Sequence, residues 1–346
     1  MTATPAPAAG LHWRPISPDD IAVWHRLVRA IEDADDPAER HTAEDLHEEL
    51  TDGSWKDPAA DSILGLDDDG VARAFGHVQV LPGDVRTIRA FCWGGVDPEW
   101  RGRGVGTALL AWQEELGRAK ITASGRPAPG RVLVHTDATA AATRRLLERA
   151  GFAQLRVFLE VTRPLDADIP PVVLPEGLRL VPYEPGLSEA MRAAHNEAFA
   201  DHWGSEPRDR ENWERQSVGG RFFRPAWSFA VLDGDEVAAY SLTSAYEQDW
   251  EPQGYTSGWT DLLGVRRPWR RRGLGSALLA ATMHALKGDG IERADLGVDM
   301  ENTNRALALY TALGYRETRR GLAYGKDVPR PEGDGAAPVA AEGARA

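Results

Sequence analysis

Apolar and polar positions follow the same succession of patterns in the two halves of this 346-residue chain. Runs that alternate with a period of two are typical of strands, whereas apolar residues that recur about every 3.6 positions are typical of amphipathic helices. In the first half these patterns predict strands at 11–16, 63–66, 72–80, 87–96, 131–135 and from 152, with helices at 20–31, 42–50, 104–118 and 140–150. In the second half they predict strands at 178–181, 228–232, 237–245, 256–265, 293–299 and 315–324, with helices at 188–199, 208–217, 274–286 and 303–313. The chain is therefore expected to form two α/β units with one common order of elements.

A proline-rich segment separates the two units. Residues 163–175 contain four prolines and are expected to form a linker. The ends, 1–10 and 329–346, are rich in Ala, Pro and Gly and are expected to be disordered. The predicted organisation is an N-terminal domain at 11–162 and a C-terminal domain at 176–328.

The two units share a loop at the place where a strand gives way to a helix. Residues 95–110 read GVDPEWRGRGVGTALL and residues 264–279 read GVRRPWRRRGLGSALL, with ten of sixteen positions identical. Glycines let the backbone turn tightly and approach a ligand, while the free N–H groups and dipole of a helix N-terminus favour an anion. A single copy would prove little, but the shared flanking residues indicate an internal repeat with an offset of 169 residues (265 − 96). A pyrophosphate is the natural ligand of such a loop.

Composition limits the classes of partner. The formal net charge of −13 argues against a nucleic-acid binder and favours a cationic substrate. The single cysteine excludes an intramolecular disulfide framework and a cysteine cluster for zinc, and indicates a reducing compartment. Residues 1–10 lack a basic segment followed by a long apolar run, and no apolar stretch is long enough to span a membrane. We expect a cytoplasmic protein without a membrane or nucleic-acid partner; the tandem units are compatible with a monomer.

The element order, with Val-x-x-x-x-Arg-x-x-Gly-x-Gly between the fourth strand and the following helix, resembles the GNAT superfamily of N-acetyltransferases twice over. The resemblance covers nearly the whole chain outside its tails. It implies an α/β (α+β) fold of two tandem GNAT-like domains, each a mixed, mostly antiparallel sheet flanked by helices. The tandem layout is similar to that of the mycothiol synthases. In the superfamily the loop amides hold the pyrophosphate of acetyl-CoA, and the fourth strand bulges and splays from the fifth to leave a V-shaped slot for the thioester.

The two halves differ at positions that the resemblance makes functional. Alignment of the units sets Asp261 against Cys92 and Tyr310 against Leu147. In GNAT enzymes a tyrosine at the place of Tyr310 can protonate the leaving thiolate, and an acid on the fourth strand commonly receives the amine or a water that deprotonates it. The resemblance therefore implies catalysis in the second half by Tyr310 and Asp261.

Each of these residues also has a structural interpretation. Tyr310 shares a helix face with other apolar residues and is compatible with a packing role. Asp261 lies in an apolar stretch, where a carboxylate serves either function or a structural hydrogen bond. Cys92, in the half without catalytic groups, is expected to be a small buried hydrophobe rather than a nucleophile.

The residues that the resemblance implies for acetyl-CoA lie in and around the second loop: Leu263, Gly264, Val265, Arg270, Arg271, Arg272, Gly273, Leu274, Gly275, Ser276, Asn302 and Asn304. The first loop forms either a second acetyl-CoA site or a structural relic, with these residues: Gly94, Val96, Arg101, Gly102, Arg103, Gly104, Val105, Gly106 and Thr107. No P-loop, dinucleotide fingerprint, His-Glu-x-x-His motif or Gly-x-Ser-x-Gly elbow occurs, and no metal is required.

Substrate identity depends on segments outside the motif. In the second half, acids and tryptophans that are candidates for holding a cation are Asp201, Trp203, Asp249 and Trp259. Acidic loops that simply face solvent are the alternative. The expected activity is acetyl-CoA-dependent N-acetylation of a small-molecule amine by direct attack in a ternary complex. A non-catalytic acyl-CoA-binding or sensor module and a protein N-acetyltransferase are the alternatives.

Overall fold

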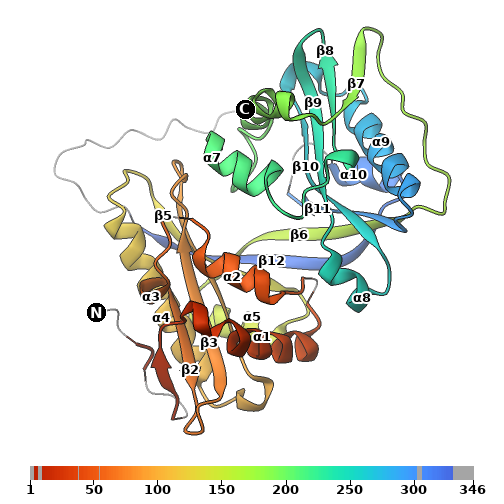
Figure 1. Cartoon of the computed structure of the whole chain (residues 1–346). Coiled ribbons are helices and arrows are strands. Elements are labelled where there is room, and N and C mark those ends of the chain that lie inside the picture. Colours follow the sequence, from red (N-terminus) through yellow and green to blue (C-terminus); the bar gives the residue numbers. More distant parts are fainter. Residues whose placement is uncertain (1–3, 7–9, 38, 54, 302–305, 330–346) are drawn as a thin grey trace.

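The computed structural model describes residues 4–6, 10–37, 39–53, 55–301 and 306–329. Two halves, whose strands and longer helices follow the same order, lie side by side, the N-terminal half in red to yellow and the C-terminal half in green to blue (Figure 1). The elements encoded by the first half are β1 (His12–Arg14), α1 (Ile21–Asp35), α2 (Ala43–Thr51), α3 (Pro58–Asp61), β2 (Ser62–Leu66), β3 (Ala72–Val80), β4 (Ile88–Val96), α4 (Val105–Ala123), β5 (Gly130–Asp137), α5 (Ala141–Arg149) and β6 (Ala153–Pro164). The second half contributes β7 (Leu178–Pro182), α6 (Ser188–Ala198), α7 (Arg210–Trp213), β8 (Phe229–Asp233), β9 (Glu236–Ser244), α8 (Trp250–Gln253), β10 (Ser257–Val265), α9 (Leu274–Gly288), β11 (Arg293–Asp299), α10 (Ala306–Ala312) and β12 (Arg316–Val328).

One sheet runs through both halves. Its 12 strands follow the order β1-β2-β3-β4-β5-β12-β6-β11-β10-β9-β8-β7. The pairs β4–β5 and β10–β11 are parallel, and the other neighbouring pairs are antiparallel. The expected fold of two α/β repeats with mixed, mostly antiparallel strands is confirmed.

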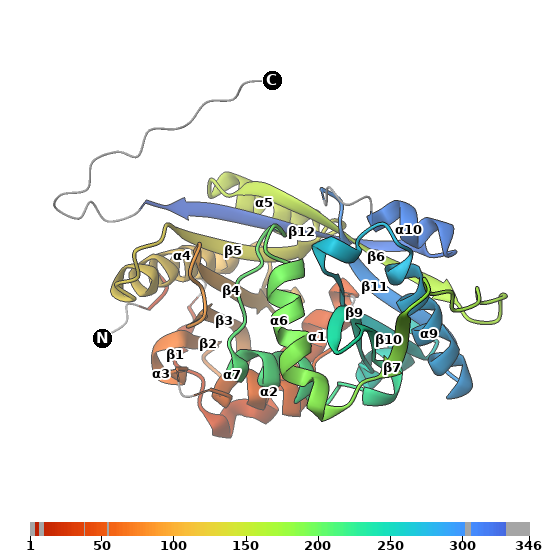
Figure 2. The same cartoon turned by 90° about the horizontal axis from the view of Figure 1, so that it is seen from above.

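The last strand of each half pairs into the sheet of the other half. β12 lies between β5 and β6, and β6 lies between β12 and β11. Both strands run across the middle of the molecule in Figure 1 and along its upper side in Figure 2. The expectation that strand 315–324 closes the second unit is therefore corrected. Periodicity could not reveal this exchange, because it reports which face of a strand is buried and both possible neighbours are antiparallel partners.

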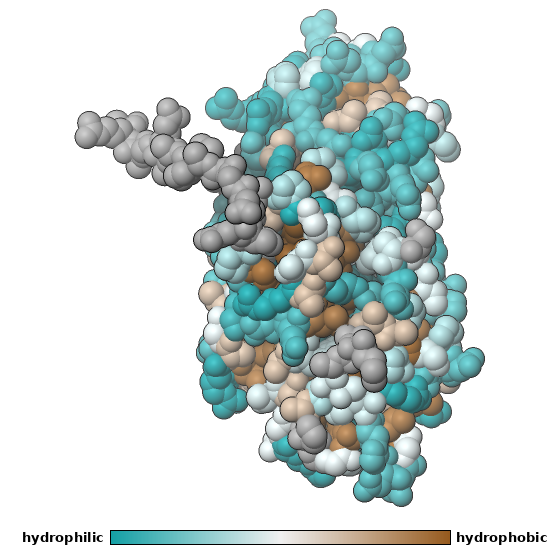
Figure 3. All heavy atoms as spheres, turned by 90° about the vertical axis from the view of Figure 1, so that its left-hand side faces the viewer, coloured by the Kyte–Doolittle hydropathy of each residue, from teal (hydrophilic) through white to brown (hydrophobic). Residues whose placement is uncertain are grey.

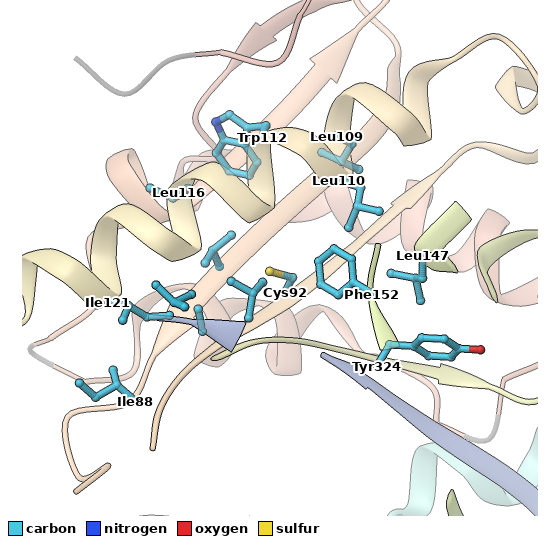
Figure 4. Close-up of a cluster of buried hydrophobic side chains, with 14 of the residues drawn as sticks. Ile88, Cys92, Leu109, Leu110, Trp112, Leu116, Ile121, Leu147, Phe152 and Tyr324 are labelled. Carbon is cyan, nitrogen blue, oxygen red and sulfur yellow. The ribbon is translucent and has the colours of Figure 1, made fainter. Parts of the chain in front are cut away.

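The hydrophobic cores show the same exchange. Tyr324 and Leu322 from β12 pack in the core of the N-terminal half with Leu147, and Figure 4 shows Leu147 and Tyr324 close to Phe152. Leu159 and Val161 from β6 pack in the core under α9 and α10 of the C-terminal half. Each half therefore buries apolar surface supplied by the other half, which couples their stability.

Several helices differ from their expected bounds, and α1, which runs to Asp35 rather than 31, is one of them. α4 continues to Ala123 instead of ending near 118, and the chain leaves it at Gly125, which has a φ of 63°. The helix expected at 208–217 is divided into α7 and a π-type turn at Glu214–Val218. Helical periodicity predicts the presence of these elements better than their ends.

The surface shown in Figure 3 is mostly hydrophilic, with hydrophobic residues in small scattered groups. Within the part of the chain that the structure describes, no helix has the length and apolar character needed to cross a membrane.

Candidate active site

Strand β10 carries an irregularity at the position of the candidate carboxylate. Its register against β9 shifts between Thr260 and Leu262, which leaves Asp261 as the extra residue of a β-bulge. Its parallel pairing with β11 covers Ser257 to Thr260 and goes no further. Beyond Thr260 the two strands separate, so the backbone from Asp261 to Val265 borders a slot between β10 and β11.

Asp261 is held by two hydroxyl groups from the end of β9. Ser244 donates to Oδ2 at 2.5 Å, and Tyr246 donates to Oδ1 at 2.8 Å. Burial raises the pKa of Asp261 to about 6, and both hydrogen bonds oppose that rise. Protein atoms surround the carboxyl group, yet more than a third of the residue's surface is accessible to water. Asp261 is thus an accessible carboxylate in a fixed orientation.

The corresponding strand of the first half lacks the bulge and the carboxylate, although its parallel pairing with β5 likewise ends early, at Cys92. The register of β4 against β3 runs without a shift from Ala90 to Val96. Cys92, the counterpart of Asp261, is buried in the apolar cluster of Figure 4, and burial raises the pKa of its thiol to about 12. Leu147, the counterpart of Tyr310, is 1 % exposed and packs in the same cluster. The first half therefore offers no carboxylate or phenol at these two positions.

The two Gly-rich loops have the same backbone conformation. Gly273 and Gly104 each cap the following helix with a φ of 83°, and no atom of the described part of the chain lies within 4 Å of the position where a Cβ would stand. Arg271 has a φ of 62°, in the left-handed region that its counterpart Gly102 occupies with a φ of 76°. At both helix starts a tight turn thus leaves open space beside free N–H groups, which fits a phosphate.

The arginines of the second loop divide into two groups. Arg270 holds the loop in place, because its side chain donates to Val265 O at 3.1 Å and to Ala198 O at 2.9 Å. In the first loop Arg101 makes the matching bond to Val96 O and pairs with Asp35. Arg271 and Arg272 are exposed, and they have no ion-pair partner among the described residues. These two are the candidates for contact with phosphate.

Two of the residues implied for acetyl-CoA binding are glycines because neighbouring side chains leave little space there. Gly264 faces the ring of buried Tyr240, and a side chain there would collide with that ring. A Cβ on Gly275 would lie 3.3 Å from Leu309 of α10, so this glycine lets α9 approach α10 closely. Leu274 is buried under β9 with Leu263 and Val265 beside it. Ser276 lies in the first turn of α9.

Tyr310 lies on α10 and is 8 % exposed. It packs in the cluster that contains Leu263 and Leu296, at a ring-centroid distance of 6.0 Å from Tyr315. Burial raises the pKa of its phenol to about 12. Asp261 instead bonds to groups on the face that carries α6 and α7, so the two residues flank the slot from opposite faces of the sheet. Asn302 and Asn304 lie outside the described residues.

A cavity of about 970 Å³ opens between the two halves. It receives residues from β3, β4, β6, β10, β11 and the segments that follow α1 and β9. Of the four candidate substrate residues, Asp249 and Trp259 line it. Trp203 lines a separate cavity of about 290 Å³, where Arg156 lies over its ring at 4.7 Å, and Asp201 pairs with Arg267 at the surface.

Three polar residues that the sequence did not single out also belong here. Ser244 and Tyr246 orient Asp261, and Glu160 of β6 lines the cavity. Ser244 and Tyr246 are two residues apart at the end of a strand, which indicates that their side chains lie on the same face. Glu160 could not be assigned to this site, because β6 enters it through the strand exchange. Among the described residues, no three His, Cys, Asp or Glu side chains are grouped so as to hold a metal ion.

Known proteins resemble this chain in sequence and in fold. The model of the acetyltransferase (GNAT) family matches twice, at residues 24–152 and 188–315. A mycothiol acetyltransferase of Salinispora arenicola is 30 % identical over 311 residues, covering 87 % of this chain and 91 % of the relative. A mycothiol acetyltransferase of Thermobispora bispora is 34 % identical over 225 residues, covering 64 % of this chain and 70 % of the relative.

Solved structures with a similar fold cover nearly the whole chain. A GCN5-related N-acetyltransferase from Sphaerobacter thermophilus has a TM-score of 0.74 at 25 % identity, covering 94 % of this chain and 98 % of the other. A tandem GNAT protein from the clavulanic acid biosynthesis pathway has a TM-score of 0.67 at 18 % identity, covering 92 % and 98 % respectively. The second likeness shows the shared fold.

Proposed function

Because this chain belongs to the acetyltransferase (GNAT) family, we propose that its C-terminal half transfers an acetyl group from acetyl-CoA to a primary amine of a small molecule. The observation that carries the proposal is the bulge of β10, which presents Asp261 beside the slot while the first half has Cys92 on an unbulged strand. The slot lies next to a loop whose geometry suits a pyrophosphate, and a cavity for the acceptor adjoins it.

The second loop binds the acyl donor. The N–H groups of Leu274, Gly275 and Ser276 have no hydrogen-bond partner among the described residues, since the first backbone bond at the start of α9 is from Ala277 N to Gly273 O. The guanidinium groups of Arg271 and Arg272 add positive charge beside these amides. The open space at Gly273 lets a phosphate approach the backbone, and acetyl-CoA fits this arrangement.

Asp261 binds the acceptor. An alkylammonium has a pKa near ~10.4, so the amine must lose a proton before it attacks the thioester carbonyl. An accessible carboxylate with a raised pKa holds the ammonium and passes its proton to water. Ser244 and Tyr246 keep Asp261 in one orientation, which favours a reactive position of the bound amine.

The slot and Tyr310 stabilise the negative charge that develops during the attack. The backbone N–H groups of Leu263 and Val265, on the strand beyond the bulge, are placed to donate to the carbonyl oxygen as it becomes negative. The neutral amine nitrogen forms the new C–N bond and loses a proton, and the C–S bond breaks. CoA leaves as a thiolate, and the proton released by the nitrogen balances its protonation to the thiol. Tyr310 donates its hydroxyl to the departing sulfur. Its raised pKa opposes complete proton transfer to a thiolate with a pKa near ~8.5, so hydrogen-bond donation is its main contribution.

The test is release of CoA thiol over a panel of amines, combined with calorimetric binding of acetyl-CoA. The panel includes a mycothiol-related amine, because relatives carry that name. We expect turnover on at least one small amine, and its loss in Asp261→Asn with acetyl-CoA binding retained. Binding of acetyl-CoA without turnover on any amine would support a sensor module instead. Turnover confined to peptide N-termini or lysines would support a protein acetyltransferase.

A further inference from the structure

The sheet presents a row of polar side chains to the cavity, on the same face as Asp261. Trp259 of β10 lies opposite Asp295 of β11, which lies opposite Thr162 of β6. Two residues earlier on β6, Glu160 lies opposite Gly297. Because side chains alternate along a strand, Trp259, Asp295 and Glu160 share one face. All three line the cavity.

The carboxylates of this cavity differ in their counter-charges. Those near α2 have polar partners: Asp45 pairs with Arg221, and Glu49 forms hydrogen bonds with His77 and Gln79. Glu160 and Asp295 have no Lys, Arg or His within ion-pair distance among the described residues. Arg319, the cation that most lowers the pKa of Glu160, is engaged with Asp36 and Asp137.

Asp295 is the clearest case of an uncompensated charge. The residue is 5 % exposed, faces the cavity, and accepts a hydrogen bond from the hydroxyl of Thr162. Burial raises the pKa of Asp295, and it raises the pKa of Glu160 to about 7. Asp295 is buried and Glu160 is half-buried, and neither has a cation beside it among the described residues, so a bound cation would stabilise both.

Trp259 lies between these carboxylates and the slot. A Cβ on Gly297 would lie 3.5 Å from the ring of Trp259, so this glycine lets the indole lie against β11. An aromatic face beside two carboxylates is a favourable environment for an ammonium group. Neighbouring strands are ~4.8 Å apart, so Glu160, two strands from β10, stands about 10 Å from β10 where the strands pair at Trp259. It stands farther from Asp261, because β10 separates from β11 beyond Thr260.

Building on the proposed function, we propose that the acceptor is an elongated dication: one ammonium is acetylated at Asp261, and a second cationic group binds Glu160 and Asp295 beside Trp259. This names the substrate class as diamines and longer amines with a second basic nitrogen. Glu160 and Asp295 are specificity-determining residues in this arrangement, and they take no part in bond making. The strand exchange is what brings Glu160 to the catalytic half.

The test compares linear diamines with monoamines of the same chain length. For the natural sequence, we expect a higher kcat/KM for a diamine whose nitrogens match the spacing between Asp261 and Glu160. Glu160→Gln should lower kcat/KM for that diamine by about 10- to 100-fold, the range for losing a hydrogen bond to a charged group, and leave the monoamine value unchanged. The matched control is Glu251→Gln. It makes the same change of charge at an exposed residue that does not line the cavity, and it should keep the diamine preference.

Several outcomes would overturn the proposal. Equal kcat/KM values for diamine and monoamine in the unmodified protein would do so, as would an equal fall for both amines in Glu160→Gln. Calorimetry with the diamine on both proteins separates this proposal from the proposed function. If no amine is acetylated but the diamine binds and Glu160→Gln weakens it, the cation site stands and the acetyl transfer fails. Asp295→Asn, checked for a cooperative thermal transition, should reproduce the loss.

Discussion

Tyr246 donates a hydrogen bond to Oδ1 of Asp261 across 2.8 Å, from the cavity side of the bulge. The bond joins the wall of the acceptor cavity to the carboxylate at the slot. It also favours the charged form of Asp261, whereas burial opposes that form. The pair therefore sets the protonation state of the group that we propose receives the ammonium.

The first prediction concerns pH. Asp261 must be ionised to bind an ammonium, so kcat/KM should rise as the pH increases through about 6, the pKa of this group. Tyr246→Phe removes a bond to the charged form, so the rising limb should move to higher pH while acetyl-CoA affinity stays constant. The measurement is a pH profile of kcat/KM with saturating acetyl-CoA. A limb in the same place in Tyr246→Phe would show that another group controls it.

The same shift predicts an effect on stability. The pKa of Asp261 is raised in the folded protein above an unfolded value near ~3.9, so the unfolded chain ionises first as the pH rises. The contribution of Asp261 to stability is therefore lost between about pH 4 and 6. Asp261→Asn should make the thermal midpoint less sensitive to pH across this window, even though activity is lost. A steeper dependence in the variant would contradict the upward shift.

The second loop offers a test of donor binding with a close control. Gly273→Glu places bulk and negative charge where the pyrophosphate approaches, and should abolish acetyl-CoA binding in the C-terminal half. Gly290→Glu is the matched change, because Gly290 has a φ of 77°, no neighbour within 4 Å of its Cβ position, and lies just after the far end of α9. Both variants carry the same backbone strain, and binding should survive in Gly290→Glu. If Gly104→Glu abolishes turnover in a folded protein and Gly273→Glu does not, the catalytic half is the first.

A substitution of Arg271 should change protein stability and acetyl-CoA binding in opposite directions. Its φ of 62° lies in the left-handed region, which favours glycine by roughly 1 kcal/mol, and Gly102 already fills the matching place in the first loop. Arg271→Gly should therefore raise the thermal midpoint slightly while it weakens acetyl-CoA binding, because a cation beside the phosphate is lost. Denaturant unfolding and calorimetry on the same sample check both parts. A more stable protein with unchanged affinity would remove Arg271 from the phosphate site.

The sequence predicted the elements and the duplicated loop because these depend on local chemistry. Periodicity identifies strands and helices, and a glycine turn before a helix is a local arrangement, as Gly104 and Gly273 show. Strand partners are different, because β6 and β12 satisfy the same backbone groups in either order. The exchange brings Glu160 into the cavity of the other half, over a sequence separation that no local pattern records. For the same reason, the orientation of Trp203 toward Arg156 was beyond local prediction.

Tyr310 gives the last prediction, through its contrast with Leu147. Tyr310→Phe keeps the ring that packs near Tyr315 and removes only the hydroxyl that we propose donates to the departing sulfur. If that contact acts in the transition state, kcat should fall by about 10²-fold or more, with acetyl-CoA affinity nearly unchanged because the loop of Gly273 is intact. Leu147→Ala, at the aligned position, should instead lower stability by about 2–5 kcal/mol through a cavity and leave the chemical step alone. Chemistry must be shown to limit the rate, by single-turnover measurement. A normal single-turnover rate in Tyr310→Phe would show that the hydroxyl takes no part in the chemical step. The ring of Tyr310 would then serve only to pack the core.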